Sequence, residues 1–529
     1  MLTLGELLLA LPFDYSPLSV PSTLITGIAI DSRKVQPGDL FVAMQGGALD
    51  GHDFIPAAVQ RGAAAVVGEK EITGLAVPYI RVGDPRLALT YLAAAYYGSP
   101  GKKMTVIGVT GTDGKTTTSN LIYRILIAAG LEAGLISTVN AVIGNEVLDT
   151  GFHVTTPDAP DVQHYLARML DAGLTHVVLE TTSHGLAQHR VDACQYDIAV
   201  VTNITHEHLD QHGSYENYRA AKGRLFELLE ETVEKPQGNP RLGVLNRDDE
   251  KSYAYLHELT RVRQVSYGLT PQADIQAENI RFDPAGLHFD AVGPDFRVAV
   301  GANLVGAYNV SNCLAAFSAA VVGLGIDPKI AAQGIAALPG IPGRMERIDL
   351  GQAFTAIVDF AHTPNALKVS LETARQILAP RPGGEGARGR GRVIAVFGSA
   401  GLRDREKRRM MAQTSAQLAD ISILTAEDPR TEPLDGILAE MAAGARDKGA
   451  VEGQSFYRIP DRGEAIRFAL KIAEPGDLVI SCGKGHEQSM CFGTTEYLWD
   501  DRTAMRAALA ELLGVDGPSM PFLPTQEKK

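Results

Sequence analysis

The sequence predicts an α/β protein of three domains, and three observations support that prediction. A chain of 529 residues is too long for one hydrophobic core and corresponds to about three domains of ~150 residues each. From residue 103 onward, strand-like and helix-like segments alternate, which is typical of mostly parallel sheets with helices on both faces. Stretches rich in Gly and Pro at 96–101 and 338–343 mark two boundaries. The predicted domains are therefore 1–100, 101–339 and 340–529.

The composition indicates a soluble protein that handles small molecules. Hydrophobic residues make up 45% and charged residues 21% of the chain, which are ordinary globular values. The net charge of -13 does not indicate the overall basic surface that is typical of nucleic-acid-binding proteins. The four cysteines lack metal-ligand spacing, so we expect reduced thiols. We find no basic leader and no apolar run long enough to span a bilayer. We therefore expect no membrane insertion and a monomer whose partners are small-molecule substrates.

The first, small α/β domain contains a polar turn that follows a strand-like run at residues 24–30. Ser32 and Arg33 lie in this turn, and a second strand-like run follows at 64–67. A serine and an arginine after a strand could bind a nucleotide, but a capped turn explains the pattern equally well. The residues alone leave both interpretations open.

A phosphate-binding loop is predicted at residues 108–118, whose sequence is Gly-Val-Thr-Gly-Thr-Asp-Gly-Lys-Thr-Thr-Thr. A strand-like run precedes it, and a helical apolar pattern follows it. Glycines let backbone N–H groups turn toward an anion, Lys115 can reach the outer phosphates, and Thr116 can hold Mg²⁺. The strict pattern G-x-x-x-x-G-K-[ST] fails because residue 109 is valine, and the variant T-G-T-x-G-K-T-T fits instead. The central domain is therefore predicted to be a P-loop-type ATPase domain with a mostly parallel sheet.

Polar residues at two further strand ends point to a metal site. The apolar run 176–179 leads into Glu180, and the run 198–202 leads into a segment that contains His208. Because ligands collect beyond the carboxyl ends of parallel strands, both side chains could converge with Thr116 on a metal that the nucleotide carries. A lone Glu or His is more often a capping or solvated residue, so the prediction depends on all three groups meeting.

A lysine occupies the apolar face of the helix predicted after Ser214. Steps of four and three residues place Lys222 on one stripe with Tyr218, Phe226 and Leu229. The pattern alone favours a snorkelling lysine whose stem packs while its ammonium reaches water.

The last domain again alternates strands and helices and is predicted to be Rossmann-like, without the glycine fingerprint. Its apolar strands lie at 356–358, 393–397, 421–424 and 478–481, and a Gly- and Arg-rich segment at 381–392 reads as a flexible loop. An RNA-binding interpretation of that segment is disfavoured in an acidic protein. The polar groups at the strand ends are Asp359, Arg403, Asp404, 427–430 and Glu487.

These motifs together resemble the Mur ligases, which build peptidoglycan precursors by ATP-dependent amide formation. The resemblance covers nearly the whole chain, and within the family it is to the ligases that add the third amino acid of the peptide. It is carried by the segments 31–33, 38–43, 110–118, 155–157, 180–190, 218–226, 343–346, 359–364 and 483–487.

The resemblance implies a role for residues in each domain. The UDP-sugar with its muramoyl dipeptide would meet Ile30, Ser32, Thr155, Thr156, Thr182, Gln188 and Arg190. ATP would meet Gly111, Thr112, Asp113, Gly114, Lys115, Thr116, Thr117, Asn309, Arg344 and Asp359. The third amino acid would meet Arg403, Glu427, Asp428, Arg430, Gly483 and Glu487.

The resemblance also reinterprets Lys222, because the family carries a carboxylated lysine at this position. Carbon dioxide adds to the neutral amine and gives a carbamate anion that can ligate Mg²⁺. Two Mg²⁺ ions are then expected, with Thr116, Glu180, His208 and Lys222 as ligands. The implied catalytic residues are Lys115, Lys222, Glu180 and His208.

The implied reaction is an ATP-dependent ligation in the bacterial cytoplasm that proceeds through an acyl phosphate. Water would hydrolyse that intermediate, so we expect the last domain to close on the central one about residues 339–343.

The identity of the third amino acid depends on residues 427–430. The family motif Asp-Asn-Pro-Arg accompanies meso-diaminopimelate, and this chain has Glu-Asp-Pro-Arg. The extra negative charge of Asp428, beside Glu427 and near Glu487, favours a distal ammonium over a distal carboxylate. Arg430 could then be neutralised internally by Asp428 or Glu427. We therefore expect a basic diamino acid, with L-lysine or L-ornithine ahead of meso-diaminopimelate.

Two alternative functions stay open at this point. Folylpolyglutamate synthetase shares the ATP loop and the lysine but lacks the first domain, while residues 483–487 disfavour the ligase that adds D-alanyl-D-alanine. An inactive sensor of UDP-sugars could have lost Lys115, Lys222 or Glu180, and all three are present.

Overall fold

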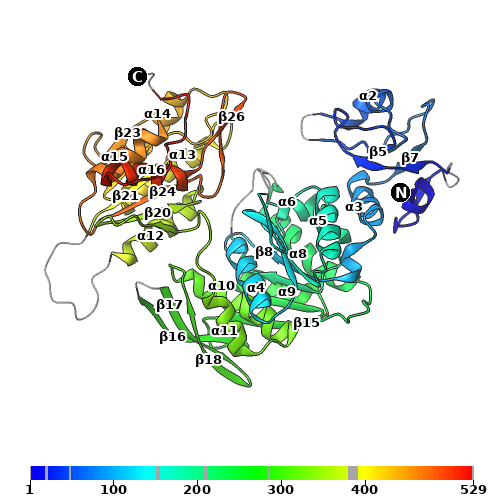
Figure 1. Cartoon of the computed structure of the whole chain (residues 1–529), viewed down its shortest axis with the longest axis horizontal. Helices are drawn as coiled ribbons and strands as arrows, with labels where there is room; N and C mark the ends of the chain where they lie inside the picture. Colours follow the sequence, from blue (N-terminus) through cyan, green and yellow to red (C-terminus); the bar gives the residue numbers. More distant parts are fainter. Residues whose placement is uncertain are drawn as a thin grey trace. The chain divides into compact units, whose positions relative to one another are not determined.

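The computed structural model describes residues 2–17, 22–46, 49–149, 155–205, 212–283, 286–378 and 391–526. The chain forms two compact units (Figure 1). The first unit contains residues 1–280, 288–301 and 309–337, and the second contains residues 281–287, 302–308 and 338–529. The larger sheets are mostly parallel and are flanked by helices, so the predicted α/β class is confirmed. Among the described residues, no helix is both long and apolar enough to cross a membrane.

The N-terminal part of the first unit is a small sheet in the order β2-β7-β6-β5-β4. Its strands are β2 (Tyr15–Ser16), β4 (Gly27–Ala29), β5 (Asp39–Val42), β6 (Ala65–Gly68) and β7 (Tyr79–Val82). The helices beside it are α1 (Leu4–Leu8), α2 (Ile55–Gln60) and α3 (Pro85–Tyr96). The single strand predicted at 24–30 is wrong, because β3 (Leu24–Ile25) pairs with β1 (Leu2–Thr3) while β4 pairs with β5.

The central part of the first unit is built on an eleven-stranded sheet in the order β11-β10-β9-β12-β8-β13-β14-β15-β16-β17-β18. Its parallel strands include β8 (Thr105–Thr110), β9 (Ala133–Ile136), β12 (His176–Glu180), β13 (Ile198–Val201), β14 (Leu242–Asn246) and β15 (Arg263–Gly268). The others are β10 (Asn140–Ile143), β11 (Glu146–Asp149), β16 (Ile275–Asp283), β17 (Gly286–Gly293) and β18 (Phe296–Ala302). Strand β8 is buried along its whole length between β12 and β13, so the carboxyl ends of these three strands are neighbours.

Helices cover this sheet (Figure 1). They are α4 (Lys115–Ala128), α5 (Ala159–Asp171), α6 (Ser183–Ala187), α8 (Tyr215–Glu231), α9 (Glu250–Leu259), α10 (Tyr308–Ser318) and α11 (Pro328–Ala336). Helix α8 begins where predicted, because the Ser214 side chain accepts a hydrogen bond from the backbone N–H of Asn217.

The second unit contains a six-stranded sheet in the order β19-β20-β24-β21-β22-β23, parallel from β20 to β23. The strands are β19 (Glu346–Ile348), β20 (Thr355–Asp359), β21 (Val393–Phe397), β22 (Ile421–Leu424), β23 (Phe456–Arg458) and β24 (Leu478–Cys482). The helices are α12 (Pro364–Ile377), α13 (Arg405–Leu418), α14 (Leu434–Arg446), α15 (Arg462–Ile472) and α16 (Asp501–Leu513). A hairpin of β25 (Ser489–Phe492) and β26 (Thr495–Leu498) follows β24.

Alternate residues of β21 point to two separate hydrophobic clusters. Val393, Ala395 and Phe397 belong to one, which includes residues of α12, α13 and α14, while Ile394 and Val396 belong to the other, which includes residues of α15 and α16. Because successive side chains of a strand face opposite sides, the sheet is covered by helices on both faces. This is the Rossmann-like arrangement that the sequence predicts. Most of the predicted flexible loop at 381–392 lies outside the described residues.

Candidate functional site

The predicted phosphate-binding loop lies between β8 and α4, as the sequence indicates. Gly114 adopts a left-handed conformation with φ of 83° immediately before the first residue of α4, Lys115. A Cβ atom at Gly114 would lie 2.3 Å from the side-chain oxygen of Asn312, so this position requires glycine. Lys115 Nζ donates a hydrogen bond to the Thr112 carbonyl at 2.8 Å, which folds its ammonium back over the loop. The loop and the helix N-terminus together form an anion-binding geometry.

Two residues that the sequence analysis did not select hold this loop in place. The backbone N–H of Asp113 donates to Asn203 Oδ1 at 3.0 Å, and Thr202 Oγ1 donates to the Asp113 carbonyl at 2.5 Å. Both partners directly follow β13, the neighbour of β8 in the sheet. The rule that ligands collect beyond the carboxyl ends of parallel strands therefore also predicts a role for Thr202 and Asn203.

The structure brings Thr116 and Glu180 together at adjacent strand ends. Thr116 Oγ1 donates to Glu180 Oε1 at 3.0 Å, and Glu180 is buried. Thr138, which the sequence analysis missed, donates to the same carboxylate from its backbone N–H at 2.9 Å and its hydroxyl at 2.8 Å. A carboxylate and a hydroxyl beside a phosphate site are suitable Mg²⁺ ligands. The predicted ligand His208 lies outside the described residues, and within those residues no cluster of three or more His, Cys, Asp or Glu side chains could hold a metal.

Lys222 is buried on α8 with its amine against the phosphate-binding loop. Its side chain is 1% exposed, and Nζ donates to the Gly111 carbonyl at 2.6 Å. The amine also lies 4.6 Å from the centre of the Tyr218 ring, whose hydroxyl contacts Thr112 Oγ1 at 3.0 Å. The snorkelling interpretation is therefore wrong, because the amine reaches the loop and not bulk water.

The residues implied for the muramoyl dipeptide form one hydrogen-bonded group, with Thr155 next to it in the chain. Thr156 Oγ1 lies 3.0 Å from Thr182 Oγ1 and accepts from the Thr182 backbone N–H. Arg190 donates to the Thr156 carbonyl at 2.7 Å and to Gln188 Oε1 at 2.8 Å. Arg190 also pairs with Asp158 at 3.2 Å. This group presents a cation and several polar atoms close to Glu180, since Thr156 also donates to the Glu180 carbonyl.

The remaining residues implied for UDP and ATP lie at three separate places. Ile30 and Ser32 are half-buried and follow β4 in the first domain. Asn309 is buried in the first turn of α10 and accepts a hydrogen bond from Asn312, the residue against Gly114.

In the second unit, Arg344 lies over the Phe360 ring, 4.3 Å from its centre. The nearby Asp359 carboxylate accepts hydrogen bonds from the backbone of Met345 and Ala361 and from Ser370. Asp359 therefore fixes the turn that carries Arg344.

Several residues implied for the third amino acid form an ionic cluster in the second unit. Lys484 Nζ lies 3.1 Å from Asp428 Oδ1 and 2.5 Å from Glu487 Oε2. Burial alone would lower the pKa of the Lys484 ammonium, but the carboxylates of Glu487 and Asp428 raise it above its ordinary value. The lysine therefore stays charged between two carboxylates.

Arg430 is not neutralised internally, contrary to the sequence-based expectation. Its guanidinium donates to the Gly401 carbonyl at 2.9 Å, and among the described residues no carboxylate lies within 4.0 Å of it. Asp428 and Arg430 both have left-handed backbones, with φ of 41° and 52°. Residues held in this region cluster at functional sites, because the surrounding structure must hold them there.

Glu427 is buried beside Gly483 and adds a third carboxyl group to this region. A Cβ atom at Gly483 would lie 2.4 Å from Glu427 Oε2, and φ of 113° at this position also favours glycine. Burial raises the pKa of the Glu427 carboxyl to about 6, and its Oε2 has no hydrogen-bond partner among the described residues. Arg403 is exposed and follows the end of β21.

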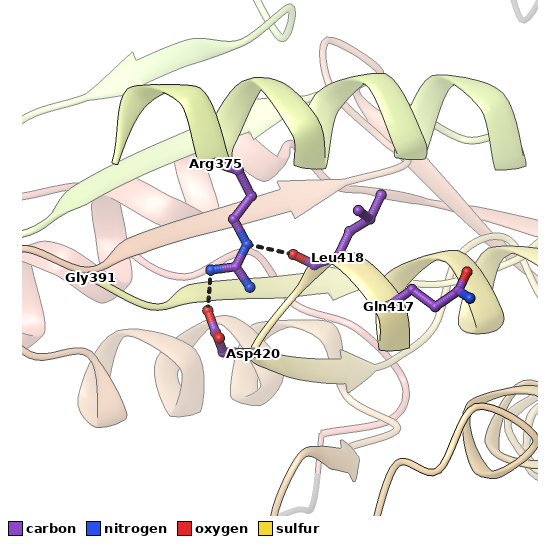
Figure 2. A pocket seen from close by; sticks show the side chains of 5 residues that line it. All are labelled: Arg375, Gly391, Gln417, Leu418 and Asp420. Atoms are coloured by element: carbon purple, nitrogen blue, oxygen red, sulfur yellow. Dashed lines mark hydrogen bonds and ion pairs between the residues drawn. The ribbon is translucent and has the colours of Figure 1, made fainter. Parts of the chain in front are cut away.

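Two cavities lie away from all these residues. One of about 450 Å³ is lined by Arg375, Gly391, Gln417, Leu418 and Asp420. Figure 2 shows the Arg375 guanidinium directed at the Leu418 carbonyl, at 2.8 Å, and at Asp420, at 2.6 Å. Gly391 and Asp420 precede β21 and β22, so this cavity lies at the amino ends of the strands, opposite the edge where ligands bind. The other, of about 540 Å³, lies in the first unit and includes Leu9 and Asp192 in its lining.

Comparison with known proteins covers nearly the whole chain. Residues 24–97 match the model described as Mur ligase family, catalytic domain, residues 109–320 match the Mur ligase middle domain, and residues 343–485 match the Mur ligase, glutamate ligase domain.

The chain is 43% identical to a UDP-N-acetylmuramyl-tripeptide synthetase of Roseiflexus sp. (strain RS-1), over 92% of this chain and 95% of the relative. It is 41% identical to a UDP-N-acetylmuramoyl-L-alanyl-D-glutamate--2,6-diaminopimelate ligase of Geobacillus thermodenitrificans (strain NG80-2), with the same coverage. A solved structure of a ligase of the latter description superposes with a TM-score of 0.66 and 30% identity, covering 97% of this chain and 100% of the other.

Proposed function

Because this chain belongs to the Mur ligase family, we propose that it joins the third amino acid to UDP-N-acetylmuramoyl-L-alanyl-D-glutamate with ATP, a step of peptidoglycan synthesis. The observation that carries the proposal is the meeting of Lys115, Thr116, Glu180 and Lys222 at the loop after β8. Membership of a family is evidence for the fold, whereas these side chains are evidence for the chemistry of phosphoryl transfer.

We assign a part of the substrates to each predicted domain. Residues 1–100 hold the uridine diphosphate, residues 101–339 hold ATP and the muramoyl dipeptide, and residues 340–529 hold the incoming amino acid. The Arg190 group beside Glu180 supports the second assignment, because it places a fixed cation near the phosphate-binding loop where a carboxylate substrate must sit. We also propose that the chain acts as a monomer in the bacterial cytoplasm, where ATP and UDP-linked substrates are available.

In the first step, an oxygen of the D-glutamyl γ-carboxylate attacks the γ-phosphorus of ATP. The bond between that phosphorus and the β,γ-bridging oxygen breaks, ADP leaves with the electron pair, and an acyl phosphate forms. Lys115 and the N–H groups of the loop bind the oxygens on which negative charge develops. Asn203 and Thr202 hold the loop, so these donors need not reorganise during the step.

Thr116, Glu180 and Lys222 fit a magnesium site at the phosphates. Thr116 and Glu180 offer oxygen atoms that already lie 3.0 Å apart. The Lys222 amine lies against the loop on a buried face, and as a carbamate it would add an anionic oxygen ligand there. Bound Mg²⁺ would neutralise phosphate charge. His208 completes the proposed set of ligands.

In the second step, an amino group of the third amino acid attacks the carbonyl carbon of the acyl phosphate. The tetrahedral intermediate then collapses, its bond to the phosphate oxygen breaks, inorganic phosphate leaves with the electron pair, and the nitrogen loses a proton to give the amide. The residues of the second unit select and orient this amino acid.

We infer that the third amino acid is 2,6-diaminopimelate. The expectation of lysine or ornithine assumed that Asp428 adds an uncompensated negative charge, but Lys484 compensates it. Asp428, Glu487, Lys484 and Arg430 together carry two negative and two positive charges. Carboxylates together with an available guanidinium suit the zwitterionic end of diaminopimelate better than a lone ammonium.

Phosphate release by the full chain tests the proposal directly. We expect release only when ATP, the UDP-muramoyl dipeptide and a diamino acid are all present. Folylpolyglutamate synthetase, which shares this loop and lysine, would instead use L-glutamate and a folate acceptor. Release with those two substrates and none with the muramoyl dipeptide would overturn the assignment.

A further inference from the structure

Lys484 lies behind the two carboxylates that face the proposed amino-acid site. Its side chain is 1% exposed, whereas the side chains of Asp428 and Glu487 are 15% and 29% exposed. The accessible groups are therefore the carboxylates, and the ammonium is the buried support beneath them.

The Lys484 ammonium contacts both carboxylate oxygens of Asp428 and one carboxylate oxygen of Glu487. The distances to Asp428 are 3.1 and 3.2 Å, and the contact with Glu487 Oε2 is 2.5 Å. The backbone N–H of Cys491 donates to Asp428 Oδ1 at 2.9 Å, so this carboxylate is fixed from two elements. Without the lysine, two carboxylates would face each other with no shared cation, and Glu487 would lose the ion pair that holds its side chain.

We propose that Lys484 is a positioning residue of the amino-acid site, which holds Asp428 and Glu487 as a paired acceptor for the distal ammonium of the substrate. This inference rests on the proposed function, since it names the support of that same site. Lys484 acts through the two carboxylates and does not itself touch the substrate.

A charge-compensated pair of variants tests the inference in the full-length chain. Lys484→Met removes the cation, and Lys484→Met combined with Asp428→Asn also removes one of the two anions. We expect the single variant to raise the KM for meso-diaminopimelate by at least ~10-fold while the KM for ATP changes less than ~3-fold. The double variant should recover only part of the KM, because removing Asp428 relieves the repulsion between the two carboxylates but also removes one acceptor of the distal ammonium.

The outcomes separate the inference from its premise. If the wild-type chain releases phosphate with no diamino acid, the proposed function fails. If the wild-type chain is active and the double variant binds the amino acid no better than Lys484→Met, the positioning role is wrong. If Lys484→Met does not fold, the double variant is compared with Asp428→Asn alone. Equal KM values for meso-diaminopimelate in these two variants would also contradict the inference.

Discussion

The amine of Lys222 lies 2.6 Å from the carbonyl oxygen of Gly111, although 111 positions separate the two residues in the chain. The contact joins the middle of α8 to the first residue after β8. Because Tyr218 on the same helix contacts Thr112, one face of α8 supports the first two residues of the loop after β8. A change on α8 should therefore act on ATP chemistry without touching the nucleotide.

Lys115→Ala should lower the turnover number by roughly 10²-fold or more, because it removes one fixed cation from a transition state in which negative charge develops. Folding should be nearly unchanged, since Lys115 is only half-buried and, within the described part of the chain, its one side-chain hydrogen bond is to Thr112. Lys103→Ala, which changes an exposed lysine just before β8, is the matched control. A near-normal turnover number for Lys115→Ala would contradict the assignment of residues 108–118 as the ATP loop.

Lys222→Ala should be inactive, and added acetate or formate should restore part of the activity. The missing element is a small anion if the lysine works as a carbamate, and a small carboxylate can then occupy its place. Lys222→Arg should stay inactive, because arginine keeps a positive charge. Activity of the arginine variant, together with no response to carboxylic acids, would show that the residue works as a cation.

Arg430 should decide between amino acids that differ in their distal carboxylate. Arg430→Asn should lower the ratio of kcat/KM for meso-diaminopimelate to that for L-lysine by ~10- to 100-fold, the value of a charge-assisted hydrogen bond of about 1.5–3 kcal/mol. Asparagine tolerates a left-handed backbone, so the free energy of unfolding of the Arg430→Asn variant should stay within about 1 kcal/mol of that of the wild type.

Arg430→Val is the matched comparison, because a β-branched residue at φ of 52° should destabilise the chain further. Competition of meso-diaminopimelate, L-lysine and L-ornithine in one reaction gives the preference of the wild-type chain. A wild-type preference for L-lysine or L-ornithine would show that Asp428 still outweighs Arg430.

Glu427 should make the second unit less stable as the pH rises from about 4.5 to about 6. Its pKa rises from an ordinary 4.5 to about 6 on folding, so in this window the folded state binds more protons than the unfolded state and stability falls with pH. A shift of this size corresponds to about 2 kcal/mol. Glu427→Gln should remove that part of the pH dependence, measured by urea unfolding at several pH values.

Glu432→Gln is a control for this effect with the opposite sign. Hydrogen bonds from the Arg408 side chain lower the pKa of Glu432 to about 2, so its contribution to stability is constant above pH 5 and is lost only in stronger acid. The slope of stability against pH between 5 and 7 should therefore match wild type in this variant. An unchanged slope in Glu427→Gln as well would contradict the raised pKa.

The sequence predicted those parts of the site that follow from strand ends. Thr116 and Glu180 meet because β8 and β12 are adjacent parallel strands, and the strand-end rule needs no knowledge of side-chain contacts. Asn203 follows the same rule, because it lies directly after β13, the other neighbour of β8. Thr138 gives no such signal, since it lies in a turn before a short antiparallel strand.

The charge arrangement around Asp428 could not be predicted from local sequence. The charged residues within two positions of Asp428 are Glu427 and Arg430, and formal charges suggested a pair between Asp428 and Arg430. The fold instead pairs Asp428 with Lys484, which is 56 positions away and lies just after β24. Likewise, periodicity placed Lys222 on an apolar stripe of α8. It could not predict whether the amine at the end of the side chain contacts water or the Gly111 carbonyl.

The left-handed backbone at Arg430 also has a consequence for how such a protein evolves. Arginine in this region is disfavoured by roughly 1 kcal/mol or more relative to glycine or asparagine, so substitution by either of these two residues should leave the fold at least as stable. Stability therefore does not protect the guanidinium, and only the need for a particular amino acid can retain it. A lineage that changes the composition of its cell wall could abandon this arginine in one mutational step without first acquiring a stabilising substitution elsewhere.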